Sequence, residues 1–144
     1  MQPPFSVLVG GREPAVSQSL RVLLEHLLKD RFQLHFGERD SWQELAAQAD
    51  AHGFDLLMVN LTATPDHNRS GGTLGEITAA NVREFKSRYR KPVIILTTWD
   101  EPGMFPGLEA AGADAVIRMP FYVADITPHI EKCLPSSSHP VRAG

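Results

Sequence analysis

Short apolar runs alternate with amphipathic helical patterns along the whole chain, and this alternation limits the possible folds more than any other feature. Each run has the length and composition of a buried strand, and apolar residues at helical spacing follow it. The five predicted strands are residues 5–9, 32–36, 55–60, 92–97 and 114–118. Five successive strand–helix units predict an α/β fold with a doubly wound parallel sheet and helices on both faces.

Local signals place several helix boundaries. Ser41 is a predicted N-cap for the second helix, and Gly53 is its predicted end. The segment between the fourth and fifth strands departs from the pattern, because two prolines and two glycines stand where a helix is expected. Pro106 can occupy a first turn, so we expect a shortened fourth helix of about two turns before Gly112.

Length and composition are those of one domain. With 144 residues, of which 42% are hydrophobic and 22% charged, the chain can bury a full core. We expect a domain over residues 1–134 and a flexible tail or linker stub over residues 135–144. Residues 61–75 form a polar connection that is long for a strand-to-helix loop.

Charge and cysteine content argue against several classes of partner and site. The net charge is -3, so we expect neither direct nucleic-acid binding nor attraction to an anionic membrane. No apolar run approaches the ~20 residues of a membrane span, and the first residues do not resemble a signal peptide, which favours the cytoplasm. Cys133 is the single cysteine, so an internal disulfide is excluded, and the six histidines are too scattered to suggest metal. We expect no cofactor.

Functional residues of an open α/β sheet collect beyond the carboxyl ends of its strands. In this chain those positions are Gly10 to Arg12, Asn60, Thr97 and Arg118 to Pro120. The sequence around them resembles the CheY-like receiver domain of two-component response regulators, over roughly residues 5–134. The matching stretches are VLVGGREP, DLLMVNLTATP, PVIILTT and GADAVIRMPF. The resemblance implies a flavodoxin-like sheet with the strand order 2-1-3-4-5 and a role in signal transduction.

The resemblance also implies which positions would carry the receiver's carboxylate chemistry. In the family, an acidic pair and an acceptor aspartate hold Mg²⁺, the aspartate attacks phosphorus, and a lysine neutralises the phosphoryl oxygens. The acidic pair falls here on Gly11 and Arg12, the acceptor on Asn60 and the lysine on Met119, so all four have been replaced. An amide is a far weaker nucleophile than a carboxylate, and Mg²⁺ requires hard anionic oxygens.

Two positions keep the family's pattern. Thr97 supplies the expected hydroxyl, and Pro120 stands where the family has a cis peptide, whereas Val116 replaces the usual switch aromatic. The degenerate phosphoacceptor pocket consists of Gly11, Arg12, Asn60, Thr97 and Met119. We therefore interpret the chain as a pseudo-receiver, a non-enzymatic signalling module that is not phosphorylated and acts by protein–protein interaction.

Some alternatives remain open at this level. Gly10 and Gly11 could cradle a phosphate, which is the best case for a small-molecule or nucleotide-binding flavodoxin-like domain using the same crevice. Arg12 could replace the metal's charge beside Asn60, or it could be a solvated turn residue. The basic residues of 82–91 favour a solvated helix face over a nucleic-acid patch.

A partner surface is predicted beside the segment that joins strands four and five. Large apolar side chains fall in or near this stretch, where a short helix can bury little, and exposed apolar groups often mark interaction sites. The residues are Trp99, Met104, Phe105 and Tyr122. The competing interpretation is that Trp99 and Phe105 fold back onto the core. We expect a protein partner from a signalling pathway, with a homodimer as one possibility.

Overall fold

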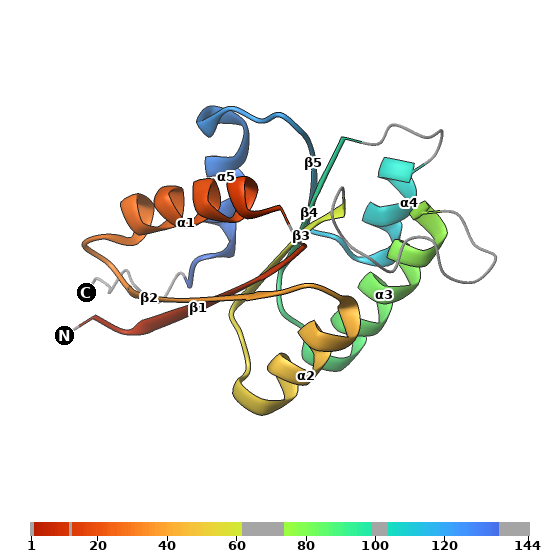
Figure 1. Ribbon diagram of the computed structural model, residues 1–144, viewed down its shortest axis with the longest axis horizontal. Helices are drawn as coiled ribbons and strands as arrows, with labels where there is room; N and C mark the ends of the chain where they lie inside the picture. The colour runs from red at the N-terminus through yellow and green to blue at the C-terminus, as the bar shows by residue number, and fades with distance from the viewer. Residues whose placement is uncertain (1, 12, 62–73, 99–103, 136–144) are drawn as a thin grey trace, which may run out of the picture.

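The computed structural model describes residues 2–11, 13–61, 74–98 and 104–135, and its architecture confirms the predicted fold class (Figure 1). Five parallel strands form one sheet in the order β2-β1-β3-β4-β5. The elements are β1 (Pro4–Gly10), α1 (Pro14–Leu28), β2 (Gln33–Arg39), α2 (Trp42–His52), β3 (Leu56–Asn60), α3 (Leu74–Tyr89), β4 (Val93–Thr97), α4 (Met104–Ala111), β5 (Ala115–Arg118) and α5 (Val123–Cys133).

The helices form a layer on each face of the sheet. Helices α1 and α5 lie on one side, and α2, α3 and α4 lie on the other (Figure 1). All five residues of β3 and all five of β4 are buried, as in central strands covered on both faces. Their side chains alternate between two apolar clusters, which we name the α1–α5 cluster and the α2–α4 cluster after the helices that close them.

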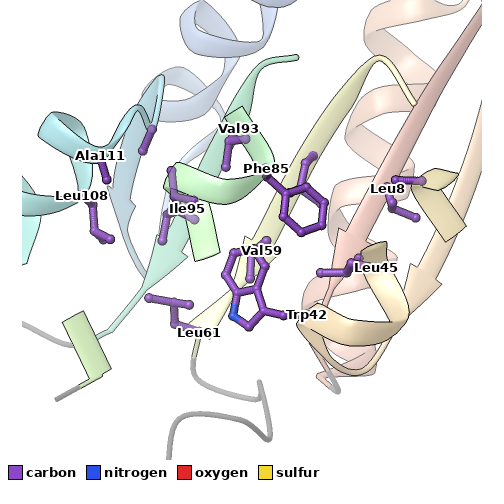
Figure 2. Close-up of a cluster of buried hydrophobic side chains, with 14 of the residues drawn as sticks. Leu8, Trp42, Leu45, Val59, Leu61, Phe85, Val93, Ile95, Leu108 and Ala111 are labelled. Atoms are coloured by element: carbon purple, nitrogen blue, oxygen red, sulfur yellow. The ribbon is translucent and has the colours of Figure 1, made fainter. Parts of the chain in front are cut away.

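The α2–α4 cluster is built around aromatic rings. Figure 2 shows Trp42 of α2 and Phe85 of α3 beside Val59 of β3, and the two ring centroids are 5.6 Å apart. Tyr89 extends this group, and its hydroxyl donates a hydrogen bond to Asp50 Oδ1 at 2.7 Å. Helices α2 and α3 are therefore fixed to each other by packing and by a polar contact at the rim.

The predicted helix boundaries are confirmed where the structure describes them. Ser41 Oγ accepts a hydrogen bond from Glu44 N at 3.2 Å, and Gly53 ends α2 at a φ of 73° while its N–H donates to Ala49 O. Helix α4 has 8 residues, compared with 11 to 16 in the other helices, and Pro106 lies in its first turn. The fourth helix is shortened as expected.

Parts of three sequence-based expectations lie outside the described residues. They concern most of the long loop of residues 61–75, the tail from residue 136 onwards, and the role of Arg12 beside Asn60, since residue 12 is not described. Within the described ranges, no helix is both long and apolar enough to cross a membrane.

Candidate functional site

The carboxyl ends of four neighbouring strands meet at one edge of the sheet. Gly10 pairs with Val59, and Asn60 pairs with Leu96 on the next strand. Thr97 pairs in turn with Arg118 on β5. The parallel register therefore brings the predicted pocket residues of β1, β3 and β4 to the same edge, next to the segment that follows β5.

Asn60 ends β3 in a buried position, with 2% of its surface exposed. Gly11 follows β1 and approaches it closely: a Cβ atom on Gly11 would lie 3.0 Å from Asn60 O and 3.1 Å from Asn60 Cβ. Gly11 also has a φ of +128°, which side-chain-bearing residues rarely adopt. The turn after β1 is thus shaped around a residue with no side chain, at a position where the resemblance implies an acid.

Thr97 and Met119 lie on the other side of Asn60 in strand order. Thr97 is fully buried, and its carbonyl oxygen accepts a hydrogen bond from Met119 N at 2.9 Å. The Met119–Pro120 peptide is cis, as the resemblance implies. The Met119 side chain is half-buried and packs against the α1–α5 cluster. The position implied for a phosphate-binding lysine is therefore part of an apolar contact.

Packing explains Gly10, the last residue of β1, and Gly11, which follows it. A Cβ atom on Gly10 would lie 2.6 Å from Leu45 Cδ1, so Gly10 allows α2 to approach the sheet. The Gly11 N–H donates to Arg39 O at 3.0 Å, so this amide is already engaged within the fold. Close backbone approach therefore gives both glycines a structural reason.

The predicted partner residues do not form one exposed surface. Met104 is only 4% exposed and lies in the α2–α4 cluster, so the expectation that it is exposed was wrong. Phe105 is half-buried, packs against the same cluster and lies beneath Arg118, whose Cζ atom is 5.6 Å from the ring centroid. Tyr122 is 78% exposed, as expected, and Trp99 lies outside the described residues.

The basic stretch at the end of α3 is engaged in ion pairs. Lys86 Nζ contacts Asp114 Oδ2 at 2.9 Å, and Arg88 Nη2 contacts Asp50 Oδ2 at 2.8 Å. Lys91 Nζ lies 3.9 Å from Asp55 Oδ1. These pairs connect α3 and the segment that follows it to neighbouring elements, which gives the cations a structural role.

Cys133 is half-buried on α5, and its Sγ atom donates a hydrogen bond to His129 O at 3.2 Å. Burial raises the pKa of the Cys133 thiol to about 11, and the nearby Asp114 carboxylate acts in the same direction. A thiol held in its neutral form is a poor nucleophile and a poor metal ligand. Across the described ranges, no group of three or more histidine, cysteine or acidic side chains could hold a metal ion.

An apolar groove beside the pocket was not predicted from the sequence. It lies between α1 and the segment from β5 to α5, has a volume of about 400 Å³, and is lined by Ala15, Val16, Ser19, Leu23, Met119, Pro120, Phe121 and Val123. A second hollow of about 620 Å³ shares three of these residues and adds Gln18, Val22 and His26. The sequence signals were weak: Val22 stands apart from the leucine stripe of α1, and Val123 begins α5.

No protein-family model matches the chain, and no curated protein matches it significantly in sequence. Solved structures with the same fold do match. A two-component response regulator from Clostridium difficile is 13% identical with a TM-score of 0.70, and the match covers 92% of this chain and 98% of that one. A response regulator from Thermotoga maritima is 19% identical with a TM-score of 0.68, at 92% and 98% coverage. A response regulator receiver domain protein from Clostridium thermocellum is 20% identical with a TM-score of 0.67, at 90% and 93% coverage. The chain thus has the flavodoxin-like fold of response-regulator receiver domains, which are domains of signalling proteins.

Proposed function

We propose that this chain is a pseudo-receiver: a non-enzymatic signalling module that is not phosphorylated on an aspartate and acts by binding another protein. Its fold is that of receiver domains, whereas the positions that carry their chemistry hold other residue types. The cytoplasm, where two-component signalling operates, is the compartment we propose for it.

The contact between Gly11 and the buried Asn60 carries this proposal. Asn60 stands at the acceptor position, and an amide does not attack phosphorus as a carboxylate does. At Gly11, a Cβ atom would come within 3.0 Å of a backbone oxygen, so the turn as it stands does not accommodate an acidic side chain. At position 60 the residue type does not support phosphoryl transfer. At position 11 the backbone conformation leaves no room for a metal-binding acid.

The environment of Met119 supports the same conclusion. A lysine at this position would have to direct an ammonium group towards the phosphoryl oxygens, but Met119 packs against the α1–α5 cluster and lines an apolar groove. Thr97 remains, yet a hydroxyl alone can neither bind Mg²⁺ firmly nor neutralise a phosphoryl group. What remains at this edge of the sheet is a binding surface, and the partner we propose is a protein of a signalling pathway.

Phosphoryl transfer tests the proposal directly. The purified chain is incubated with acetyl phosphate and millimolar Mg²⁺, and its intact mass is measured beside a receiver domain that keeps the full acidic set. We expect a phosphoryl adduct on the control and none on this chain, with no heat of Mg²⁺ binding in calorimetry. A stoichiometric adduct on this chain would refute the pseudo-receiver assignment.

A further inference from the structure

A polar hollow lies between the edge of the sheet and the end of α2, on the face opposite α1 (Figure 1). Its volume is about 390 Å³, within the range of small-molecule sites. The lining comes from the middle of β1 and β2 and from the last turn of α2 with the residues that follow it. It includes Leu8, His35, Gly37, Gln48, His52 and Phe54, and we call this site the β2–α2 hollow.

The sequence places polar side chains on both sides of this hollow. Gly37 pairs with Leu8, which belongs to the α2–α4 cluster, so Gly37 and His35, two residues earlier, face α2. Gln48 and His52 are one helical turn apart and lie on one face of α2. Two positions of the edge strand and two of the helix therefore enclose one space.

Gly37 stands where the fold does not require a glycine. Its backbone is not in the left-handed region, and the pairing of β1 with β2 continues through this position without a bulge. Among the described atoms, a Cβ on Gly37 would meet only Leu8 Cδ1, at the ordinary contact distance of 3.5 Å. Glycine weakens a strand, and where no bulge or bend explains it, it often marks the close approach of a ligand or of another backbone.

The missing side chain opens space over the face of the sheet. A strand added to β2 would form its hydrogen bonds in the plane of the sheet, beside the outer edge, and would gain nothing from a glycine. The space over Gly37 is bounded instead by the side of α2 that carries Gln48 and His52. A molecule held between strand and helix is therefore the occupant that uses this glycine.

The polar groups of the hollow can orient such a molecule. Arg39 Nη2 donates a hydrogen bond to Gln48 Oε1, so the Gln48 amide keeps its Nε2 hydrogens for another acceptor. An imidazole can donate with one nitrogen and accept with the other, and the structure gives neither His35 nor His52 a side-chain partner among the described residues. The hollow thus offers donors and acceptors that the fold itself does not use.

Charge and shape define the class of ligand. None of the described residues that line the hollow is aspartate, glutamate, lysine or arginine, so a charged ligand would lose hydration without meeting an opposite charge there. Leu8 and Phe54 supply apolar surface, and Gly37 leaves its peptide bare for contact with a flat ring. Two histidines alone are a poor metal site, and the described residues provide no third ligand.

We propose that the β2–α2 hollow binds a small uncharged heteroaromatic molecule, with its ring over Gly37 and its polar edge towards Gln48 and the two histidines. This site goes beyond the pseudo-receiver function, which rests on the carboxyl ends of the strands and on a different face of the argument's chemistry, the loss of phosphoryl transfer. Each proposal can fail alone: a chain that is phosphorylated but binds a heterocycle, or one that does neither, would distinguish them.

Amide chemical shifts of the full 144-residue chain, measured by NMR during ligand titration, test the site. The probes are nicotinamide and adenine, which are uncharged near neutral pH, and nicotinate, which has the ring of nicotinamide but carries a carboxylate. A fragment of this size should bind with a Kd on the order of 1 mM. We expect at least one uncharged probe to shift the signals of His35, Gly37 and Gly53 saturably, and nicotinate to cause no saturable shift.

Gly37→Val separates binding from stability. Valine is favoured in strands and would fill the space over β2, so the melting temperature should stay unchanged or rise while affinity for the probe falls at least about tenfold. Gly107→Ala, on α4, is the matched control and should leave affinity unchanged, because a Cβ there meets nothing within 4 Å. Gln48→Met keeps the length of the side chain but removes the amide, and it should also weaken binding.

Three results would overturn the proposal. The first is the absence of a saturable shift with either uncharged probe. The second is an affinity that neither Gly37→Val nor Gln48→Met lowers. The third is a set of shifts confined to Gly10, Asn60 and Thr97, which would place the ligand at the carboxyl ends of the strands instead.

Discussion

Gly11 lies directly against Asn60, so that a Cβ atom at position 11 would come within 3.0 Å of Asn60 O. The two residues end or follow neighbouring strands, and they occupy the positions at which the receiver resemblance implies acids that share a metal ion. A close backbone approach therefore occupies the place where that resemblance implies acids. A side chain added at position 11 would therefore first disturb the packing against Asn60.

Adding a side chain at position 11 should destabilise the fold. Gly11→Ala is expected to lower the free energy of unfolding by about 1–3 kcal/mol, because of the φ of +128° and the contact with a backbone oxygen. Urea denaturation measures it. Gly107→Ala is the matched control: a Cβ there meets nothing within 4 Å, and inside α4 it should stabilise by about 0.5–1 kcal/mol. Equal effects of the two substitutions would contradict the role of the contact.

Restoring the acceptor alone should not restore phosphorylation. Asn60→Asp supplies a carboxylate at the end of β3, but the acids at positions 11 and 12 and the cation at position 119 are still missing. Adding Met119→Lys supplies the cation without a metal site. We expect neither variant to incorporate phosphate from acetyl phosphate in a mass measurement. Near-stoichiometric incorporation by the single variant would mean that the edge of the sheet binds Mg²⁺ in a way that the residues do not indicate.

Asn60→Asp should also make stability depend on pH. Position 60 is 2% exposed, and such burial raises the pKa of a carboxyl group above its usual ~3.9. The folded state then binds a proton more tightly than the unfolded state, so the variant should be most stable near pH 4. Relative to the parent it should lose about 2–4 kcal/mol as the pH rises to 7. Gln43→Glu, an amide-to-acid change at an exposed position of α2, should show no such loss in parallel urea titrations.

The fold could be predicted because its signals are local. Apolar runs, helical spacing, the Ser41 cap and the Gly53 terminus each act within a few residues, and alternating strands and helices leave few topologies. The residues of the pocket could be predicted because the apolar runs also show where each strand ends. The identity of Asn60 and Gly11 was visible in the sequence, but their distance was not, since it depends on how β1 and β3 are placed side by side.

The exposure of the apolar side chains could not be predicted in the same way. The proline and glycine content of the segment before α4 indicated poor burial, yet Met104 begins α4 and lies in the α2–α4 cluster, because even a short helix has one face towards the sheet. The apolar groove between α1 and the segment from β5 to α5 depends on the relative placement of two helices about 100 residues apart, as the Arg31–Glu131 pair shows. No local pattern in the sequence records that placement.

Truncations in α4 test where its apolar residues act. Met104→Ala should destabilise the protein by about 2–5 kcal/mol because it leaves a cavity in the α2–α4 cluster, whereas Met104→Leu should cost less than about 1.5 kcal/mol. Phe105→Ala, at a half-buried position, should fall between these values. Melting temperatures and denaturant midpoints measure how strongly each of the three variants is destabilised. An unchanged stability in Met104→Ala with loss of a binding partner would restore the predicted interaction role of this residue.

Cys133 provides a probe of the packing of α5 against the sheet. Because burial raises the pKa of its thiol to about 11 from an ordinary 9.0, the folded protein at pH 8 should contain about 100-fold less thiolate than the unfolded chain. Alkylation by iodoacetamide should be slower by at least that factor in the native protein than in urea. The sign of the linked stability follows: the unfolded thiol ionises first, so stability should fall as the pH rises from 9 towards 11. Cys133→Ala should abolish labelling and remove this part of the loss of stability at alkaline pH. Equal labelling rates in the folded and unfolded parent would place the thiol in solvent and contradict its contact with His129 O.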